Sequence, residues 1–181
     1  MTRLLLVRHA EAAGSWDEDD DDPGLSPDGA RVAAALAEKL PPGFAVLSSP
    51  LARARATAAP IAARHGRPVR VVAAVGEVPS PPEERGARAA WLRGLLASRW
   101  PDVSATVQAW RSQVLTTLLG LGEDTVVVTH YVAINVAVGA ATGDDRVGCC
   151  APANCSVTRF ELDRGRLRLA ERGVDAGVAP R

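Results

Sequence analysis

Short apolar runs separated by longer stretches with helical spacing constrain the fold more than any other feature of this sequence. The runs that we expect to be strands span residues 4–7, 44–47, 68–75 and 125–128. The first is entirely apolar, which is typical of a central strand buried on both faces. Strands that alternate with helices predict an α/β fold, a three-layer α/β/α sandwich around a mainly parallel sheet.

Signals for helix starts and turns divide the rest of the chain. A helix is expected to begin at Pro27, with Ser26 as its N-cap, and to stop before the Pro-Pro-Gly sequence at 41–43. Further helices are expected over residues 51–64, 83–100, 103–121 and 131–141. Residues 157–162 and 166–170 bracket an Asp-Arg-Gly turn and predict a C-terminal antiparallel hairpin, and residues 173–181 are expected to be loose.

Length and charge limit the kinds of protein that this chain can be. It has 181 residues, of which 47% are hydrophobic, so we expect one domain over residues 1–181. Basic and acidic side chains number 21 each, and the resulting zero net charge argues against a nucleic-acid partner. No run reaches the roughly 18 to 20 apolar residues that span a bilayer, so no membrane partner is expected. Nothing in the sequence indicates an oligomeric state.

The cysteines indicate a cellular compartment but no metal. Cys149, Cys150 and Cys155 are an odd number, and no export signal accompanies them. We therefore expect no disulfide framework, and a reducing cytoplasmic location. Their C-C-x4-C spacing does not match a zinc knuckle, so we assign them no metal.

Two histidines and two arginines follow the ends of the apolar runs. Arg8 and His9 follow the first run, Arg53 comes shortly after the second, and His130 follows the fourth. Ligands of an open parallel sheet bind outside the carboxyl ends of its strands, so we expect these side chains to converge. Arginine matches the geometry of phosphate, and a histidine with one ring nitrogen fixed by a hydrogen bond can attack phosphorus. The sequence therefore predicts a site for a phosphate dianion.

Four blocks, in order along the chain, resemble the histidine phosphatase superfamily, which includes the cofactor-dependent phosphoglycerate mutases. They are RHAEA at 8–12, DPGLSPDG at 22–29, SSPLARARAT at 48–57 and VVVTH at 126–130. The resemblance implies that His9 is the nucleophile and forms a phosphohistidine. It also implies that Arg8 and Arg53 clamp the phosphate and that His130 donates to it.

The resemblance further implies a carboxylic acid that protonates the leaving oxygen, worth roughly 10²- to 10⁴-fold in rate. Glu77, which follows the third run, is our choice, and Glu83 and Glu84 are its rivals. Ser15 stands about where mutase-like members carry an asparagine that contacts phosphate. Tyr131 replaces a glycine common in the family, and we expect its backbone N–H to face phosphate.

Together these residues predict a metal-independent phosphomonoester hydrolase, a histidine acid-type phosphatase that needs no cofactor. We expect its substrate to be a small phosphorylated metabolite, with a phosphoprotein kept open. A phosphoglycerate-mutase-type phosphotransferase, a protein phosphohistidine phosphatase and a non-catalytic phosphate-binding module are the alternatives. The short stretch between Glu77 and His130, about 52 residues, favours hydrolysis over mutase activity.

Two other features need an interpretation. The acidic run at 17–22 is either a solvated loop or a cover over the pocket that disfavours polyanionic substrates. A second Arg-His pair, in the sequence R-H-G at 64–66, follows a helical pattern and has a glycine suited to a helix C-cap, so we do not expect it to be catalytic.

Overall fold

The computed structural model describes residues 1–14, 22–81 and 87–177. A six-stranded sheet lies at its centre, with strand order β3-β2-β4-β1-β5-β6. The strands are β1 (Thr2–Arg8), β2 (Ala45–Ser48), β3 (Val69–Val71), β4 (Thr125–Thr129), β5 (Val157–Asp163) and β6 (Arg166–Glu171). The first four are mutually parallel, and β5 and β6 form an antiparallel hairpin joined to β1.

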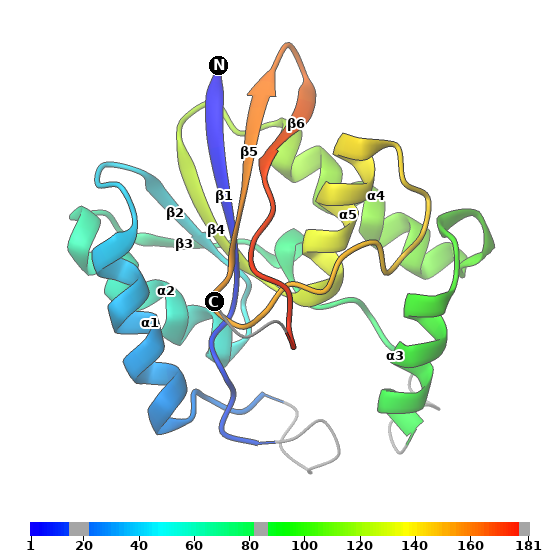
Figure 1. Ribbon diagram of the computed structural model, residues 1–181, viewed down its shortest axis with the longest axis horizontal. Coiled ribbons are helices and arrows are strands. Elements are labelled where there is room, and N and C mark those ends of the chain that lie inside the picture. Colours follow the sequence, from blue (N-terminus) through cyan, green and yellow to red (C-terminus); the bar gives the residue numbers. More distant parts are fainter. Residues whose placement is uncertain (15–21, 82–86, 178–181) are drawn as a thin grey trace.

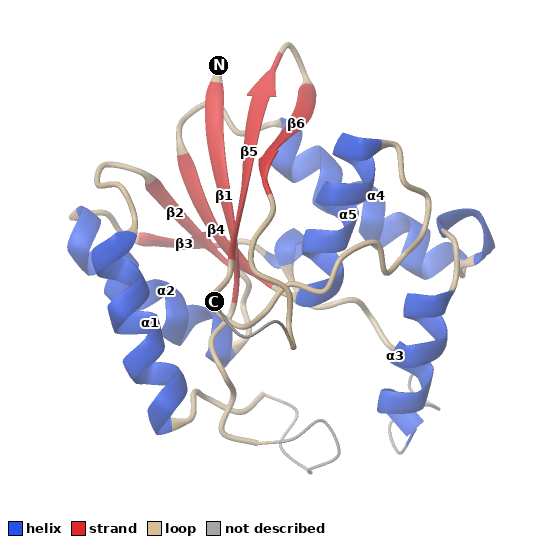
Figure 2. Cartoon of the chain, in the orientation of Figure 1, coloured by secondary structure: helices blue, strands red, loops and turns tan. Residues whose placement is uncertain are grey.

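Helices cover both faces of this sheet (Figure 1, Figure 2). They are α1 (Pro27–Lys39), α2 (Ala52–His65), α3 (Arg88–Ala97), α4 (Ala105–Leu119) and α5 (Tyr131–Thr142). Short 3-10 turns, η1 (Ala73–Val75) and η3 (Trp100–Asp102), interrupt the connections. The α/β class and the C-terminal hairpin are confirmed. None of the helices in the described ranges combines the length and apolar composition needed to cross a bilayer.

Strand β1 separates two hydrophobic cores. Its side chains alternate, so that Leu4 and Leu6 pack with residues of α4 and α5 while Leu5 and Val7 pack with residues of α1 and α2. All four are at most 3% exposed. Full burial of such a side chain stabilises the fold by roughly 1.5 to 3 kcal/mol, so the apolar run at 4–7 fixes β1 in the middle of the sheet.

The start of α1 is set by the residues that predicted it. The Ser26 hydroxyl accepts the Gly29 N–H at 2.9 Å, and Pro27 is the first helical residue. Gly29 also lets the helix approach the chain beside the first strand, because a Cβ there would lie 2.2 Å from the carbonyl oxygen of Glu11. The Ser26 N–H donates to that same oxygen at 3.0 Å. The first turn of α1 therefore braces the segment that follows β1.

Two expectations about local structure are wrong in part. The run at 68–75 is a strand only as far as Val71, because the chain then turns into η1. The Thr129 hydroxyl donates to the Val75 carbonyl at 2.6 Å and holds this turn against β4. Residues 173–177 are not loose, because they pair with the loop before β5, as described below.

The hairpin turn matches its sequence. Arg164 and Gly165 both have positive φ, 48° and 74°, as a two-residue primed turn requires. Gly66, likewise at a φ of 60°, ends α2 as the predicted C-cap, so the R-H-G sequence at 64–66 lies at a helix C-terminus.

Candidate active site

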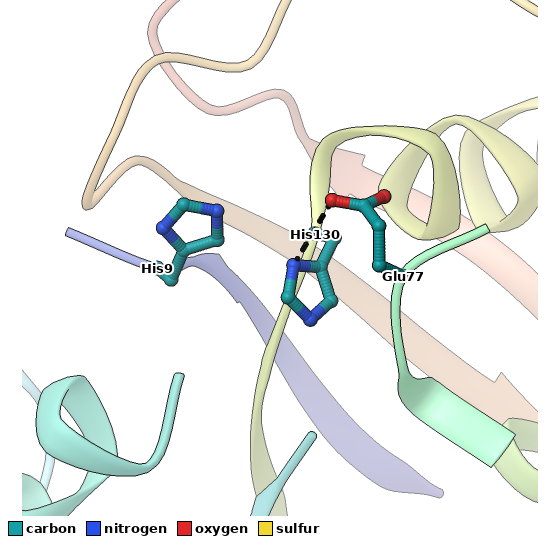
Figure 3. A group of neighbouring side chains, drawn as sticks. All are labelled: His9, Glu77 and His130. Carbon is teal, nitrogen blue, oxygen red and sulfur yellow. Dashed lines mark ion pairs between the residues drawn. The ribbon is translucent and has the colours of Figure 1, made fainter. Parts of the chain in front are cut away.

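The predicted side chains meet at the carboxyl edge of the parallel strands. Arg8 ends β1 and His9 follows it, Arg53 lies in the first turn of α2, and His130 caps the start of α5 after β4. The rings of His9 and His130 are 5.1 Å apart between centroids. Glu77 approaches from the segment after η1, and Figure 3 shows it beside His130, with His9 across from them.

His9 is held in its neutral form. Its side chain is buried, and Nδ1 lies 2.7 Å from the carbonyl oxygen of Ala10. A carbonyl can only accept, so Nδ1 carries the proton and Nε2 keeps its lone pair. Burial, together with the nearby charges of His130 and Arg53, lowers the pKa of His9 to about 3. At neutral pH the ring is therefore uncharged.

The backbone around His9 is fixed on three sides. Its N–H donates to the Thr129 carbonyl at 3.0 Å, and its carbonyl accepts the Asn154 side-chain amide at 2.9 Å. The next N–H, of Ala10, donates to the Thr57 hydroxyl at 3.0 Å. That hydroxyl donates in turn to the Arg53 carbonyl at 2.8 Å, so it links His9 to the first turn of α2.

Arg53 contacts both His9 and Glu77. Its side chain is 8% exposed, and its Nε lies 3.3 Å from His9 Nε2. One terminal nitrogen is 3.5 Å from Glu77 Oε2, and the other is 3.8 Å from Asp22 Oδ1. That same Asp22 oxygen accepts the Ala52 N–H at 2.7 Å and so caps a helix whose N-cap, Leu51, makes no side-chain hydrogen bond. No role was predicted for Asp22 itself, although it opens the second block and ends the acidic run.

Glu77 is held in its ionised form by its neighbours. Its carboxylate is 6% exposed, its Oε1 accepts the Val78 N–H at 3.2 Å, and its Oε2 is 3.3 Å from His130 Nδ1. Burial alone would raise the pKa of this carboxyl, but His130 and Arg53 outweigh burial and lower it to about 2. The contact of Glu77 with both basic groups supports its choice as the acid. Its rivals, Glu83 and Glu84, lie outside the described residues, as do Ser15 and residues 17–21 of the acidic run.

His130 is oriented by Ser49, a residue of the third block for which no separate role was predicted. It is fully buried, and its Nε2 lies 2.7 Å from the Ser49 hydroxyl. Ser49 is itself anchored, because its N–H donates to the Val128 carbonyl at 3.0 Å. Because Nε2 is directed toward Ser49, the other ring nitrogen, Nδ1, faces the Glu77 carboxylate (Figure 3).

Arg8 is held from two directions. A terminal nitrogen donates to the Pro152 carbonyl at 2.9 Å, and the guanidinium lies over the Tyr131 ring, 5.3 Å from its centroid. Burial lowers the pKa of Arg8 and raises that of Tyr131. Within the described residues, Arg8 Nε is buried and makes no hydrogen bond. A buried donor without an acceptor is costly, so Arg8 favours an anionic ligand.

The same groups include a possible set of metal ligands. One potential ligand atom from each of His9, Glu77 and His130 lies within 4.8 Å of the others. Arg53, however, touches both His9 Nε2 and Glu77 Oε2, so a cation would have to displace a guanidinium from between them. With Arg8 adding a second positive charge, the donor set suits phosphate better than a metal ion.

Comparisons with known proteins agree with this chemistry. The family model described as histidine phosphatase superfamily (branch 1) matches residues 4–175. No curated protein sequence matches the chain significantly. A structure of phosphoserine phosphatase from Entamoeba histolytica, in complex with 3-phosphoglyceric acid, has 22% identity and a TM-score of 0.76 over 98% of each chain. A mycobacterial glucosyl-3-phosphoglycerate phosphatase has 21% identity and a TM-score of 0.65, over 93% of this chain and 97% of its own. At such identities the likeness is one of fold.

Proposed function

The chain belongs to the histidine phosphatase superfamily, and from this premise we propose that it hydrolyses phosphomonoesters through a phosphohistidine on His9, without a metal. The observation that carries the proposal is the state of His9. A buried, neutral imidazole has its proton fixed on Nδ1 by Ala10, and its unprotonated Nε2 accepts a hydrogen bond from Arg53 Nε. A nucleophile held beside a phosphate-binding group is the arrangement that this reaction needs.

In the first step the phosphate is bound by Arg8, Arg53 and His130. Nε2 of His9 attacks phosphorus, and the bond between phosphorus and the ester oxygen breaks. Glu77 gives its proton to that oxygen, so an alcohol leaves. In the second step a water molecule gives a proton to Glu77 and attacks the phosphohistidine, which releases inorganic phosphate and restores neutral His9. The two arginines stabilise the equatorial oxygens in both steps.

This mechanism requires Glu77 to acquire a proton when substrate binds. In the empty site its pKa is about 2 because His130 and Arg53 stabilise the carboxylate. A bound phosphate dianion turns both partners toward itself and adds its own repulsion, which removes the causes of the low pKa. Substrate binding therefore causes Glu77 to take up its proton, and without substrate Glu77 stays ionised.

We further propose that the substrate is a small phosphorylated metabolite and that the enzyme is a cytoplasmic, histidine acid-type phosphatase. The two compared phosphatases are named for phosphoserine and for glucosyl-3-phosphoglycerate, which are metabolites of this kind. The three cysteines, all free thiols, favour a reducing compartment. Ser15 and the Tyr131 N–H stay predicted phosphate ligands, and the assignment of residues 1–181 to one domain stays a prediction.

Release of phosphate from p-nitrophenyl phosphate in EDTA, at mildly acidic pH, tests the proposal. We expect wild type to turn over and His9→Ala to be inactive. His65→Ala, which alters the histidine of the R-H-G sequence at 64–66, is the matched control and should retain wild-type activity. Equal rates in wild type and His9→Ala would overturn the assignment of the nucleophile. Transfer of the phosphoryl group to a second substrate without phosphate release would identify a mutase instead.

A further inference from the structure

The chain after β6 returns along the loop that precedes β5 (Figure 1). Three hydrogen bonds join the two segments. The Ala151 N–H donates to Asp175 Oδ1 at 3.1 Å, the Ala176 N–H donates to the Ala151 carbonyl at 2.6 Å, and the Ala153 N–H donates to the Val174 carbonyl at 2.9 Å. Residues 173–177, which we call the C-terminal segment, are thus paired with residues 151–153.

Pro152 lies between the two residues that make these bonds. It has no N–H, and its carbonyl oxygen accepts from Arg8 at 2.9 Å. Residues 151 and 153 therefore face the C-terminal segment through their hydrogen bonds, while residue 152 faces the site. The same loop donates the Cys155 N–H to the Arg8 carbonyl at 2.9 Å. The position of the Arg8 guanidinium depends on a loop that the C-terminal segment fixes in place.

The segment reaches this loop because its first residue is a glycine. A Cβ on Gly173 would stand 3.0 Å from the Ser156 side chain and 3.1 Å from the Thr158 hydroxyl. The Gly173 N–H donates to that hydroxyl at 3.3 Å. Close approach at residue 173 sets the path of the chain toward Asp175, and a Cβ there would require the segment or the facing β5 side chains to shift by a few tenths of an ångström.

We propose that the C-terminal segment positions the phosphate clamp, with Asp175 as its main positioning residue. Through the Ala151 N–H it fixes the Pro152 carbonyl, which holds the guanidinium of Arg8 over Tyr131. A long arginine side chain loses much rotamer freedom when it binds an anion, and a clamp that is already ordered binds more tightly. This inference rests on the proposed function, because it assumes that Arg8 binds phosphate.

Calorimetric titration of the full chain with inorganic phosphate tests it without relying on turnover. Asp175→Ala removes the acceptor of the Ala151 N–H, and Gly173→Ala adds the colliding Cβ. We expect each to raise the Kd for phosphate, and the KM for p-nitrophenyl phosphate, roughly three- to tenfold, with kcat little changed. Asp175→Asn keeps an acceptor oxygen and should bind as wild type. Val174→Ala, altered at an exposed side chain whose carbonyl is retained, is the control.

These measurements distinguish a positioning role of the C-terminal segment from a purely structural one. If Asp175→Ala lowers Tm but leaves the Kd of the folded protein unchanged, the segment only supports the fold and the inference fails. In Arg8→Met, which has no guanidinium to position, adding Asp175→Ala should not weaken phosphate binding further; additive weakening would overturn the route through Arg8. A wild type that binds no phosphate would instead overturn the proposed function itself.

Discussion

Binding of an anion at the site should add a proton to Glu77, and the structure sets the size of the effect. A pKa of about 2, against 4.5 for an ordinary glutamate, corresponds to roughly 3 kcal/mol in favour of the carboxylate. At pH 5.5 only about one empty molecule in three thousand then carries the proton. The attraction between Glu77 and Arg53 at 3.5 Å amounts to roughly 5 kcal/mol at an effective dielectric constant of 20. His130 is the larger stabilising influence, so an anion that draws both His130 and Arg53 to itself removes the attractions that keep the carboxylate ionised.

Sulfate is a suitable probe because it stays a dianion near pH 5.5 and does not itself take up protons. Calorimetric titrations in two buffers with different ionisation enthalpies give the number of protons bound along with the anion. We expect wild type to take up about one proton more than Glu77→Gln, since only wild type can protonate this side chain. His9, whose pKa of about 3 an anion would also raise, is present in both proteins and does not affect the difference.

Equal proton uptake in the two proteins would refute this reasoning. It would mean that Arg53 and His130 continue to hold the Glu77 carboxylate in the complex. The leaving oxygen would then have to receive its proton from another group, or leave without one.

Three further outcomes are expected. The pKa of Glu77 is lower in the folded than in the unfolded protein, so its contribution of roughly 3 kcal/mol to the free energy of unfolding is present above about pH 4.5 and is lost as the pH falls toward 2. Urea unfolding should therefore show a smaller loss of stability between pH 4.5 and 2 in Glu77→Gln than in wild type. Ser49→Ala should lower kcat/KM roughly tenfold by freeing the His130 ring, while Ser48→Ala, whose hydroxyl donates only to the Ser49 carbonyl, should change it little. Asp22→Ala should lower the free energy of unfolding by about 1 kcal/mol through loss of the α2 cap and should raise KM, whereas Asp22→Asn should retain the stability measured by urea unfolding.

The parts of the fold that local patterns encode were predictable from the sequence. Ser26 and Pro27 marked the start of α1, and Gly66 marked the end of α2, because caps depend on the nearest residues alone. The convergence of His9 and His130 followed from topology, because parallel strands place their carboxyl ends at one edge. The 5.1 Å between their rings agrees with that expectation.

The contacts that the sequence could not predict join residues far apart in the chain. Pro152 reaches Arg8 across 144 positions, and Ser49 reaches His130 across 81, with no periodicity to indicate either pair. The strand expected at 68–75 was too long because its apolar residues fill the turn of η1 as readily as they would fill a strand. Pairing of residues 173–177 was missed because a polar, glycine-containing end resembles a free tail until its partner loop is placed.

The central place of β1 in the sheet also determines when the molecule can fold. Leu4 pairs with Thr125 on one side and with Phe160 on the other. Both hydrogen-bonding edges of β1 therefore stay unpaired until strands more than a hundred residues further along the chain have been synthesised. Sheets with such distant pairings fold slowly, and their unpaired strands are open to aggregation in the meantime. A growing polypeptide therefore exposes the apolar run at 4–7 until β4 and β5 have been made. His9, Arg8 and His130 come together only after those strands have joined β1.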